Sequence, residues 1–302
     1  MTAPDAGPTE AGPADTAPVI VGVDGGASGH DALVLGQWAA EVLAVPLVVA
    51  VVHPAPAGGA GRVDAEWIAD RHRAAEAVLE GARTVLKDAT GPVEYRTVAS
   101  TSASHGLHDL AEELGAQTIV VGSGKAAPPR RLFAGSTAER LLAGSVCPVA
   151  VAPAGLQRPP GSLGRIGVAY IDTLDGRAAL ESAALLAART GSPIRLYTAV
   201  ADNDTTLPPL IGEDTERAFL HLARETYERS LEAAAASVPD IEIDFTILIG
   251  NVVDALAELD EVDVLFCGSR GYGPARRVLL GGVSTKLMRR AKLPVVVVPR
   301  GS

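Results

Sequence analysis

The chain has 302 residues, 47% of them hydrophobic, which is enough apolar material for two domain cores. Its formal net charge of −10 argues against a nucleic-acid-binding surface, and no apolar run reaches the roughly 20 residues of a membrane-spanning helix. Two cysteines without metal-ligand spacing favour a reducing compartment. We therefore expect a cytoplasmic, two-domain protein that binds neither nucleic acid nor membranes.

The first 17 residues are rich in Pro, Gly, Ala and acidic residues, and we expect them to form a disordered tail. After this tail, short β-branched runs alternate with longer runs of helical period, a pattern typical of βα units that build a parallel sheet. The clearest helices of the first half are expected at 28–44 and 64–89. Its strands are expected at 19–23, 47–52, 94–98, 118–121 and 149–151.

Residues 154–164 have the composition of a linker and lead into the second half. Its longest helix is expected at 216–236, and its strands at 166–170, 194–200, 244–249, 262–267 and 295–298. At an offset of 146 residues the chain aligns with itself, so that Gly122 meets Gly268 and Gly135 meets Gly281. This repeat predicts two copies of one domain, at 18–153 and 165–302.

Glycines follow the fourth predicted strand of each half, where doubly wound sheets bind ligands. If the first strand lies beside the fourth, this crevice is bordered by Asp24 and the Gly122 loop, and in the second half by residues 170–172 and the Gly268 loop. Glycine lets backbone N–H groups converge on an anion, and a following helix N-terminus adds partial positive charge. Composition alone leaves open whether these glycines bind phosphate or only form tight turns.

No arrangement of catalytic residues is recognisable. The sequence lacks a G-x-S-x-G elbow, a P-loop and a metal-ligand triad. His105 and His108 share one helix face, but without a third ligand nearby in the sequence a solvated surface is the favoured interpretation. Cys147 and Cys267 are expected to be buried thiols. We therefore predict no catalytic residue, no metal site and no enzymatic activity.

Several segments together resemble the universal stress protein family in its tandem form: "VDGG" after the first strand, "VVGSG" and "FCGSRGYG" at the fourth strands, "LLGGVS", and the closing "CPVAVAP" and "LPVVVVP". The resemblance extends from residue 19 to residue 299. It implies an α/β fold with two tandem, doubly wound, five-stranded parallel-sheet domains of strand order 3-2-1-4-5. It also implies that the halves pack as a pseudo-dimer along their final strands and, in many members, that ATP is bound.

The family's ATP signature is G-x2-G-x9-G-[ST], together with an Asp at the end of the first strand. In the first half Lys125 occupies the place of the second glycine, and in the second half Gly282 replaces Ser/Thr while Ile171 replaces Asp. The nucleotide-binding residues implied by the resemblance are Asp24, Gly122, Gly135, Ser136 and Thr137 in the first half, and Gly268, Arg270, Gly271, Gly281, Gly282, Val283 and Ser284 in the second.

The resemblance implies a stress-response or regulatory protein that binds ATP, with or without Mg²⁺, and has no dedicated catalysis. A degenerate scaffold that binds no nucleotide and acts through protein partners is the alternative, and a homo-oligomer beyond the pseudo-dimer is left open. The second half keeps all three signature glycines, and residues 268–302 hold eight Arg or Lys and no acidic residue. We therefore expect triphosphate contacts to dominate in the second half.

Overall fold

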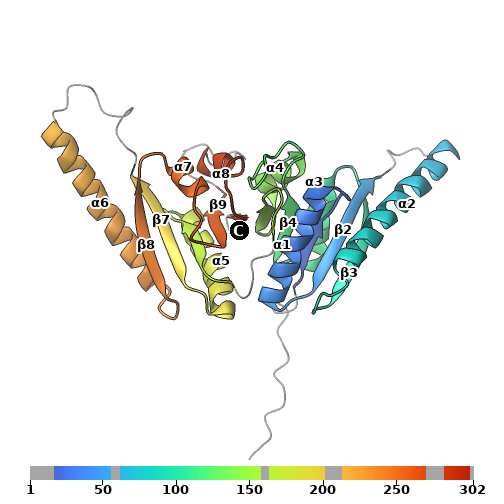
Figure 1. Ribbon diagram of the computed structural model, residues 1–302, viewed down its shortest axis with the longest axis horizontal. Helices are drawn as coiled ribbons and strands as arrows, with labels where there is room; N and C mark the ends of the chain where they lie inside the picture. Colours follow the sequence, from blue (N-terminus) through green and yellow to red (C-terminus); the bar gives the residue numbers. More distant parts are fainter. Residues whose placement is uncertain (1–16, 56–61, 158–162, 201–212, 270–281, 300–302) are drawn as a thin grey trace, which may run out of the picture.

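The computed structural model describes residues 17–55, 62–157, 163–200, 213–269 and 282–299, so most of the predicted tail lies outside the described residues. The described part forms two α/β halves that lie side by side (Figure 1). The strands are β1 (Val19–Gly22), β2 (Leu47–Pro54), β3 (Val93–Ser100), β4 (Thr118–Gly122), β5 (Val149–Ala152), β6 (Ile166–Ala169), β7 (Ile194–Val200), β8 (Ile243–Ile249), β9 (Val264–Gly268) and β10 (Val295–Val298). The helices are α1 (Ala27–Leu43), α2 (Arg62–Val85), α3 (Ala103–Leu114), α4 (Ser136–Gly144), α5 (Leu174–Thr190), α6 (Glu213–Ala236), α7 (Val252–Ala257) and α8 (Gly282–Leu287).

Every strand predicted from the sequence is present, with ends displaced by a few residues. Helix α1 stops one residue earlier than predicted, because Ala44 has a left-handed backbone (φ 53°) and its N–H returns to the carbonyl groups of the last turn. None of the helices that the structure describes combines the length and the apolar character of a transmembrane segment.

All the described strands belong to one sheet, in the order β3-β2-β1-β4-β5-β10-β9-β6-β7-β8. Within each half the pairs are parallel, and the strand order is 3-2-1-4-5 as predicted. Strand β1 pairs with both β2 and β4, so the winding direction reverses between β1 and β4. The predicted crevice therefore lies at the carboxyl ends of these two strands.

The two halves meet through their final strands. Strand β5 pairs antiparallel with β10, with Val151 opposite Val295 and Val149 opposite Val297. Both strands are buried along their whole length. The predicted pseudo-dimer is confirmed, because this pairing covers two apolar edges that would otherwise be open to association.

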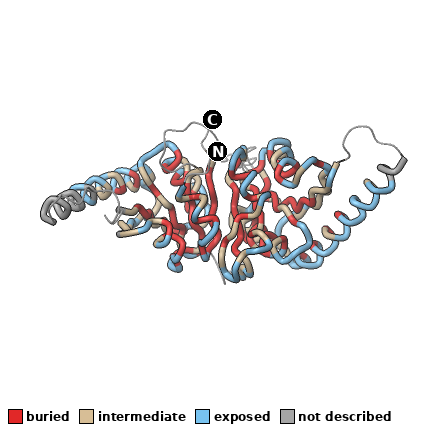
Figure 2. Tube along the Cα trace, turned by 90° about the horizontal axis from the view of Figure 1, so that it is seen from above, coloured by how far each residue is buried: buried red, intermediate tan, exposed pale blue. Residues whose placement is uncertain are grey.

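Helices cover both faces of the sheet. Residues of α1, α2, α5 and α6 contribute to the core on one face, and residues of α3, α4, α7 and α8 to the core on the other. Successive strand residues alternate between these cores, as Ile20 does between Val19 and Val21. Figure 2 shows the buried residues concentrated along the sheet, while the outer end of α2 is exposed.

A buried carboxylate on α1 fixes the chain where it leaves the first half. Asp31 is only 5% exposed, and its two oxygens accept hydrogen bonds from the N–H groups of Gly155 (2.9 Å) and Leu156 (3.1 Å). Both residues lie in the segment that follows β5, which ends at Ala152. Asp31 therefore satisfies two backbone donors and determines the direction of the segment between the halves.

We predict that Asp31→Ala lowers the free energy of unfolding by about 2–4 kcal/mol, because two hydrogen bonds to a charged group are lost and their donors stay unsatisfied. Urea denaturation followed by circular dichroism measures this change. Asp31→Asn, which keeps one acceptor oxygen, should lose less. The control Asp240→Ala, at an exposed residue, should change stability by less than about 0.5 kcal/mol. Equal effects of Asp31→Ala and Asp240→Ala would contradict the assignment.

Candidate functional site

The turn between β1 and α1 presents a carboxylate at the crevice. Gly25 has a left-handed backbone (φ 77°), which lets the chain reverse immediately after Asp24. The Asp24 Oδ1 atom accepts a hydrogen bond from the Gly26 N–H at 2.9 Å. This bond fixes the carboxylate, which remains exposed at the end of β1.

Gly122, at the end of β4, is needed for packing as well as for ligand access. A Cβ at this position would collide with the Ser28 carbonyl oxygen, because α1 begins directly against the end of β4. Gly268 has the same role in the second half, where a Cβ would lie 2.6 Å from the Asp175 carbonyl oxygen. These two signature glycines are thus explained by backbone packing alone, with or without a ligand.

The loop after β4 folds back on itself. The Gly124 N–H donates to the Phe133 carbonyl at 2.6 Å, and the Ser123 hydroxyl donates to the Ala152 carbonyl at 2.8 Å. A Cβ on Gly124 would lie 3.1 Å from the Cα of Gly135, so the two glycines face each other closely. The loop therefore brings the end of β4 directly beside the start of α4.

Helix α4 begins at this point without a side-chain cap. Its N-cap residue is Gly135, and its first residues are Ser136 and Thr137. The N–H groups in the first turn of a helix have no partner within the helix, and the helix dipole is positive at this end. The arrangement can therefore bind an anion between α4 and the loop.

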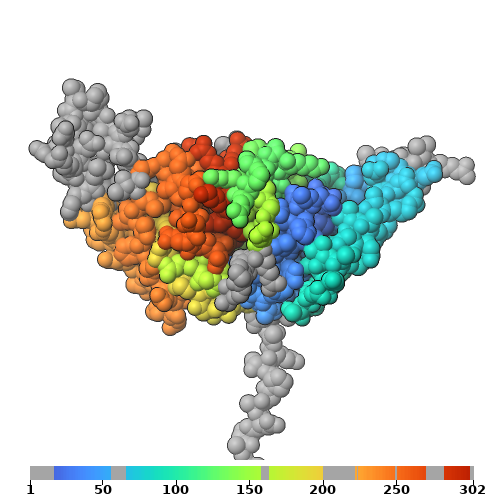
Figure 3. Space-filling model, viewed as in Figure 1, coloured from blue at the N-terminus to red at the C-terminus, as the bar shows by residue number. Residues whose placement is uncertain are grey.

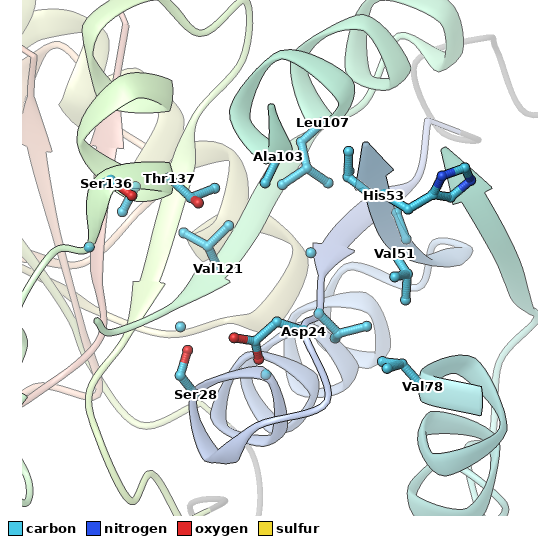
Figure 4. A pocket seen from close by; sticks show the side chains of 18 of the residues that line it. Asp24, Ser28, Val51, His53, Val78, Ala103, Leu107, Val121, Ser136 and Thr137 are labelled. Atoms are coloured by element: carbon cyan, nitrogen blue, oxygen red, sulfur yellow. The ribbon is translucent and has the colours of Figure 1, made fainter. Parts of the chain in front are cut away.

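These elements enclose a cavity of about 520 Å³. In Figure 4, Ser136 and Thr137 lie on one side, Asp24 in the middle, and Val51, Val78 and His53 on the opposite side. The cavity thus joins a polar, glycine-lined end to an end with more apolar surface. Asp24, Gly122, Gly135, Ser136 and Thr137, all implied by the resemblance, line this one cavity.

Sequence reasoning did not identify His53 or the contribution of α2. Arg71, Ala74, Ala75 and Val78 line the cavity from α2. Their spacing of i, i+3, i+4 and i+7 marks one helix face, which was a signal available in the sequence. That spacing did not reveal that this face borders the end of β2.

Two cations line the cavity, Lys125 from the β4–α4 loop and Arg71 from α2. Among the described residues neither forms an ion pair with a carboxylate, whereas many other arginines do; these include Arg73, Arg83, Arg96, Arg131, Arg165, Arg177, Arg195, Arg224, Arg289 and Arg290. Beside the single carboxylate of Asp24, the described lining therefore carries an excess of positive charge.

The equivalent crevice of the second half is smaller in the part of the chain that the structure describes, with a volume of about 90 Å³. Tyr197 and Ala169 lie at the register positions that Ala50 and Gly22 occupy in the first half, and both are bulkier. Ile171 lines the crevice where the first half has Asp24. Asp172 is not among the described residues that line the crevice, and its carboxylate pairs with Arg177 at 2.7 Å.

Three residues on which the expectation for the second half rests, Arg270, Gly271 and Gly281, lie outside the described residues. Gly268, Val283 and Ser284 line the small crevice, and Gly282 begins α8 nearby. The Ser284 hydroxyl is buried and donates to the Gly268 carbonyl at 2.8 Å. It therefore does not offer its proton in place of the hydroxyl that Gly282 lacks.

Residues considered for other chemistry have structural roles. In the described residues no group of three His, Cys, Asp or Glu could hold a metal ion. His105 and His108 instead approach Asp109 and Glu112 on the same helix, at 3.6 and 3.8 Å. Both cysteines are free and buried, and burial raises the pKa of Cys147 to about 11 and that of Cys267 to about 12. These thiols are therefore protonated at neutral pH and unreactive.

Residues of the second half contact the β4–α4 loop, which borders the first-half cavity. The N–H groups of Leu132 and Ala134 donate to the carbonyls of Ala291 and Met288, at 2.8 and 2.7 Å. Figure 3 shows the two segments in contact, green beside red, at the top of the molecule. Leu132 is fully buried there. The cavity in one half is thus shaped by contacts with the other.

A cluster of charges reinforces this contact. Arg131 donates to Glu258 at 2.6 Å and to the Arg290 carbonyl at 2.8 Å, and Lys292 pairs with the same Glu258 at 2.5 Å. The hydrogen bond from Arg131, followed by that from Lys292, lowers the pKa of Glu258 from 4.5 to about 2. Glu258 therefore remains ionised in mildly acidic solution.

We predict that the contribution of Glu258 to stability depends on pH. A lowered pKa in the folded state stabilises the fold above the ordinary pKa of 4.5, and this contribution disappears as the pH falls toward about 2. In urea titrations, Glu258→Gln should therefore be less stable than wild type at pH 6, and the difference should shrink below about pH 4. The exposed control Glu232→Gln should show no such trend. A difference for Glu258→Gln that is constant across this range would contradict the prediction.

Two doubly wound halves, joined edge to edge and with a glycine-lined crevice at the carboxyl ends of β1 and β4, define a tandem α/β protein. The sequence model of the universal stress protein family matches residues 16–153 and again 163–299. The chain therefore belongs to the universal stress protein family, in its tandem form, as the resemblance implied.

Similar proteins agree with this assignment over nearly the whole chain. A universal stress protein of Mycobacterium tuberculosis strain H37Rv is 31% identical over 293 residues, which cover 93% of this chain and 99% of that protein. A universal stress protein of Mycobacterium bovis matches with the same values. The crystal structure of a universal stress protein from Archaeoglobus fulgidus shares the fold, with a TM-score of 0.64, 22% identity, and coverage of 95% of this chain and 98% of that one.

Proposed function

We propose that this tandem universal stress protein binds an adenine nucleotide, ATP, in the cavity of its first half and acts as a cytoplasmic stress-response or regulatory protein. The observation that carries the proposal is the cavity of about 520 Å³ that joins Asp24 to the glycine-lined start of α4. Its volume lies within the range of about 300–1,000 Å³ that is usual for small-molecule sites.

The shape and polarity of the cavity suit the parts of a nucleotide. The phosphate groups would lie at the first turn of α4, where backbone N–H groups and the hydroxyls of Ser136 and Thr137 are available. The carboxylate of Asp24 would accept a hydrogen bond from the nucleoside, and the base would lie toward Val51 and Val78 (Figure 4). The larger cavity and the carboxylate favour the first half over the second, which reverses the preference drawn from the sequence.

We propose binding without dedicated catalysis. Hydrolysis or group transfer needs a positioned general base or nucleophile within reach of the reacting phosphate. Among the described residues that line the cavity, the carboxylate of Asp24 accepts the Gly26 N–H, and His53 lies at the end opposite α4. A regulatory protein that reports nucleotide occupancy needs no such group.

We expect Asp24→Ala to weaken ATP binding about tenfold to hundredfold, because one hydrogen bond to a charged group is lost. Isothermal titration calorimetry of the full chain measures the effect, with thermal unfolding as a check of folding. The matched control is Asp172→Ala, which removes the neighbouring carboxylate of the second half and should bind ATP like wild type. If Asp172→Ala weakens binding more than Asp24→Ala does, the second half holds the site. If wild type binds no ATP, the degenerate scaffold is the correct function.

A further inference from the structure

Lys125 stands at the cavity where the family signature has its second glycine. It is exposed, lines the cavity, and has no carboxylate partner among the described residues. Two other cations of the contact between the halves already have partners, since Arg131 pairs with Glu258 and Arg289 pairs with Glu139 on α4. Lys125 is therefore a cation at the α4 end of the cavity that no described carboxylate neutralises.

The backbone of the loop does not need a glycine at residue 125, because the preceding residue supplies one. Gly124 makes the close approach to α4, since a Cβ there would lie 3.1 Å from the Gly135 Cα and 3.2 Å from the Phe133 carbonyl oxygen. Its N–H is bonded to the same Phe133 carbonyl. In this loop the position that requires glycine is therefore residue 124, one before the position in the family signature. Residue 125 can consequently carry a side chain.

Electrostatics at this end favour an anion. The ammonium group of Lys125 and the positive end of the α4 dipole carry the same sign, so each disfavours the other unless negative charge lies between them. A phosphate group supplies that charge. Lysine binds phosphate as a point charge in other nucleotide sites, so its chemistry fits this position.

The described residues at this end offer few ligands for a magnesium ion. Magnesium is usually held by one or two carboxylates together with phosphate oxygens. Asp24 is the sole carboxylate among the described residues that line the cavity, and it already accepts the Gly26 N–H. No trio of His, Cys, Asp or Glu occurs elsewhere in the described parts. The described lining therefore supplies one carboxylate as a ligand for a metal ion, and it supplies Lys125 as a cation that can neutralise phosphate without one.

We propose that Lys125 takes the place of the divalent metal ion and binds the phosphate chain directly, so that this site binds nucleotide phosphates without needing a metal ion. This inference rests on the proposed nucleotide function, and it adds which cation balances the charge of the phosphates. It follows that chelation of Mg²⁺ leaves binding intact, because the compensating cation belongs to the protein. Removal of the Lys125 charge makes binding depend on added metal.

The test is calorimetric titration of the full chain with ATP, once in EDTA and once in excess Mg²⁺. Wild type should bind in EDTA, with an affinity within about threefold of that in Mg²⁺, a difference under 1 kcal/mol. Lys125→Met, which keeps the length of the side chain, should lose about tenfold to hundredfold in EDTA. Lys87→Met is the control, because Lys87 is an exposed lysine away from the cavity. It should bind ATP like wild type.

A second variant, Lys125→Gly, restores the glycine of the family signature. It should bind ATP more weakly than wild type in EDTA and should recover affinity when Mg²⁺ is added. The inference is overturned if wild type binds only in Mg²⁺, or if Lys125→Met and wild type bind equally in EDTA. Both results would leave the proposed function standing. Absence of wild-type binding under both conditions would instead overturn the proposed function itself.

Discussion

The antiparallel pairing of β5 with β10 is the constraint on which the other features depend. It joins two five-stranded sheets into one and buries two valine-rich edges that would invite aggregation. Because β10 runs beside β5 in the opposite direction, the residues before β10 lie next to the loop that follows β4. The backbone bonds from Leu132 and Ala134 to Ala291 and Met288 follow from this geometry. The interface between the halves thus also shapes the first-half cavity.

The duplicated halves share their packing but differ in their crevices. Gly122 and Gly268 lie at strand ends where the start of a helix packs too closely for a Cβ atom. The fold therefore requires glycine at this position in each half. Retained glycines are consequently poor evidence that a half binds ligand. The positions that line the crevice are more informative, since Tyr197 fills space that Ala50 leaves open. The two halves thus keep the same fold, while the cavity formed by the described residues is larger in the first half.

The sequence predicted the strands and the repeat because both depend on local patterns. Alternating β-branched residues mark strands wherever they occur, and self-alignment needs no structure. The strand order came from the family resemblance. The sequence could not predict that Arg71 and His53 border the cavity, because this depends on how α2 crosses the end of β2. The relative volumes of the two crevices could not be predicted either, because each volume depends on which side chains are neighbours across the sheet.

The chain has glycine at residue 124 and not at residue 125, where the family's ATP signature has its second glycine. This difference shows which physical requirement the glycine meets. The physical need is a close approach between the loop and the start of α4, and it is met by a glycine at whichever position lies at the point of contact. Once Gly124 meets it, residue 125 is released for a side chain. Because Lys125 is exposed and hydrated in the free protein, it loses part of that hydration when it pairs with phosphate. The net gain from the ion pair is therefore smaller than the bare attraction between the two charges, and added salt weakens it further by screening.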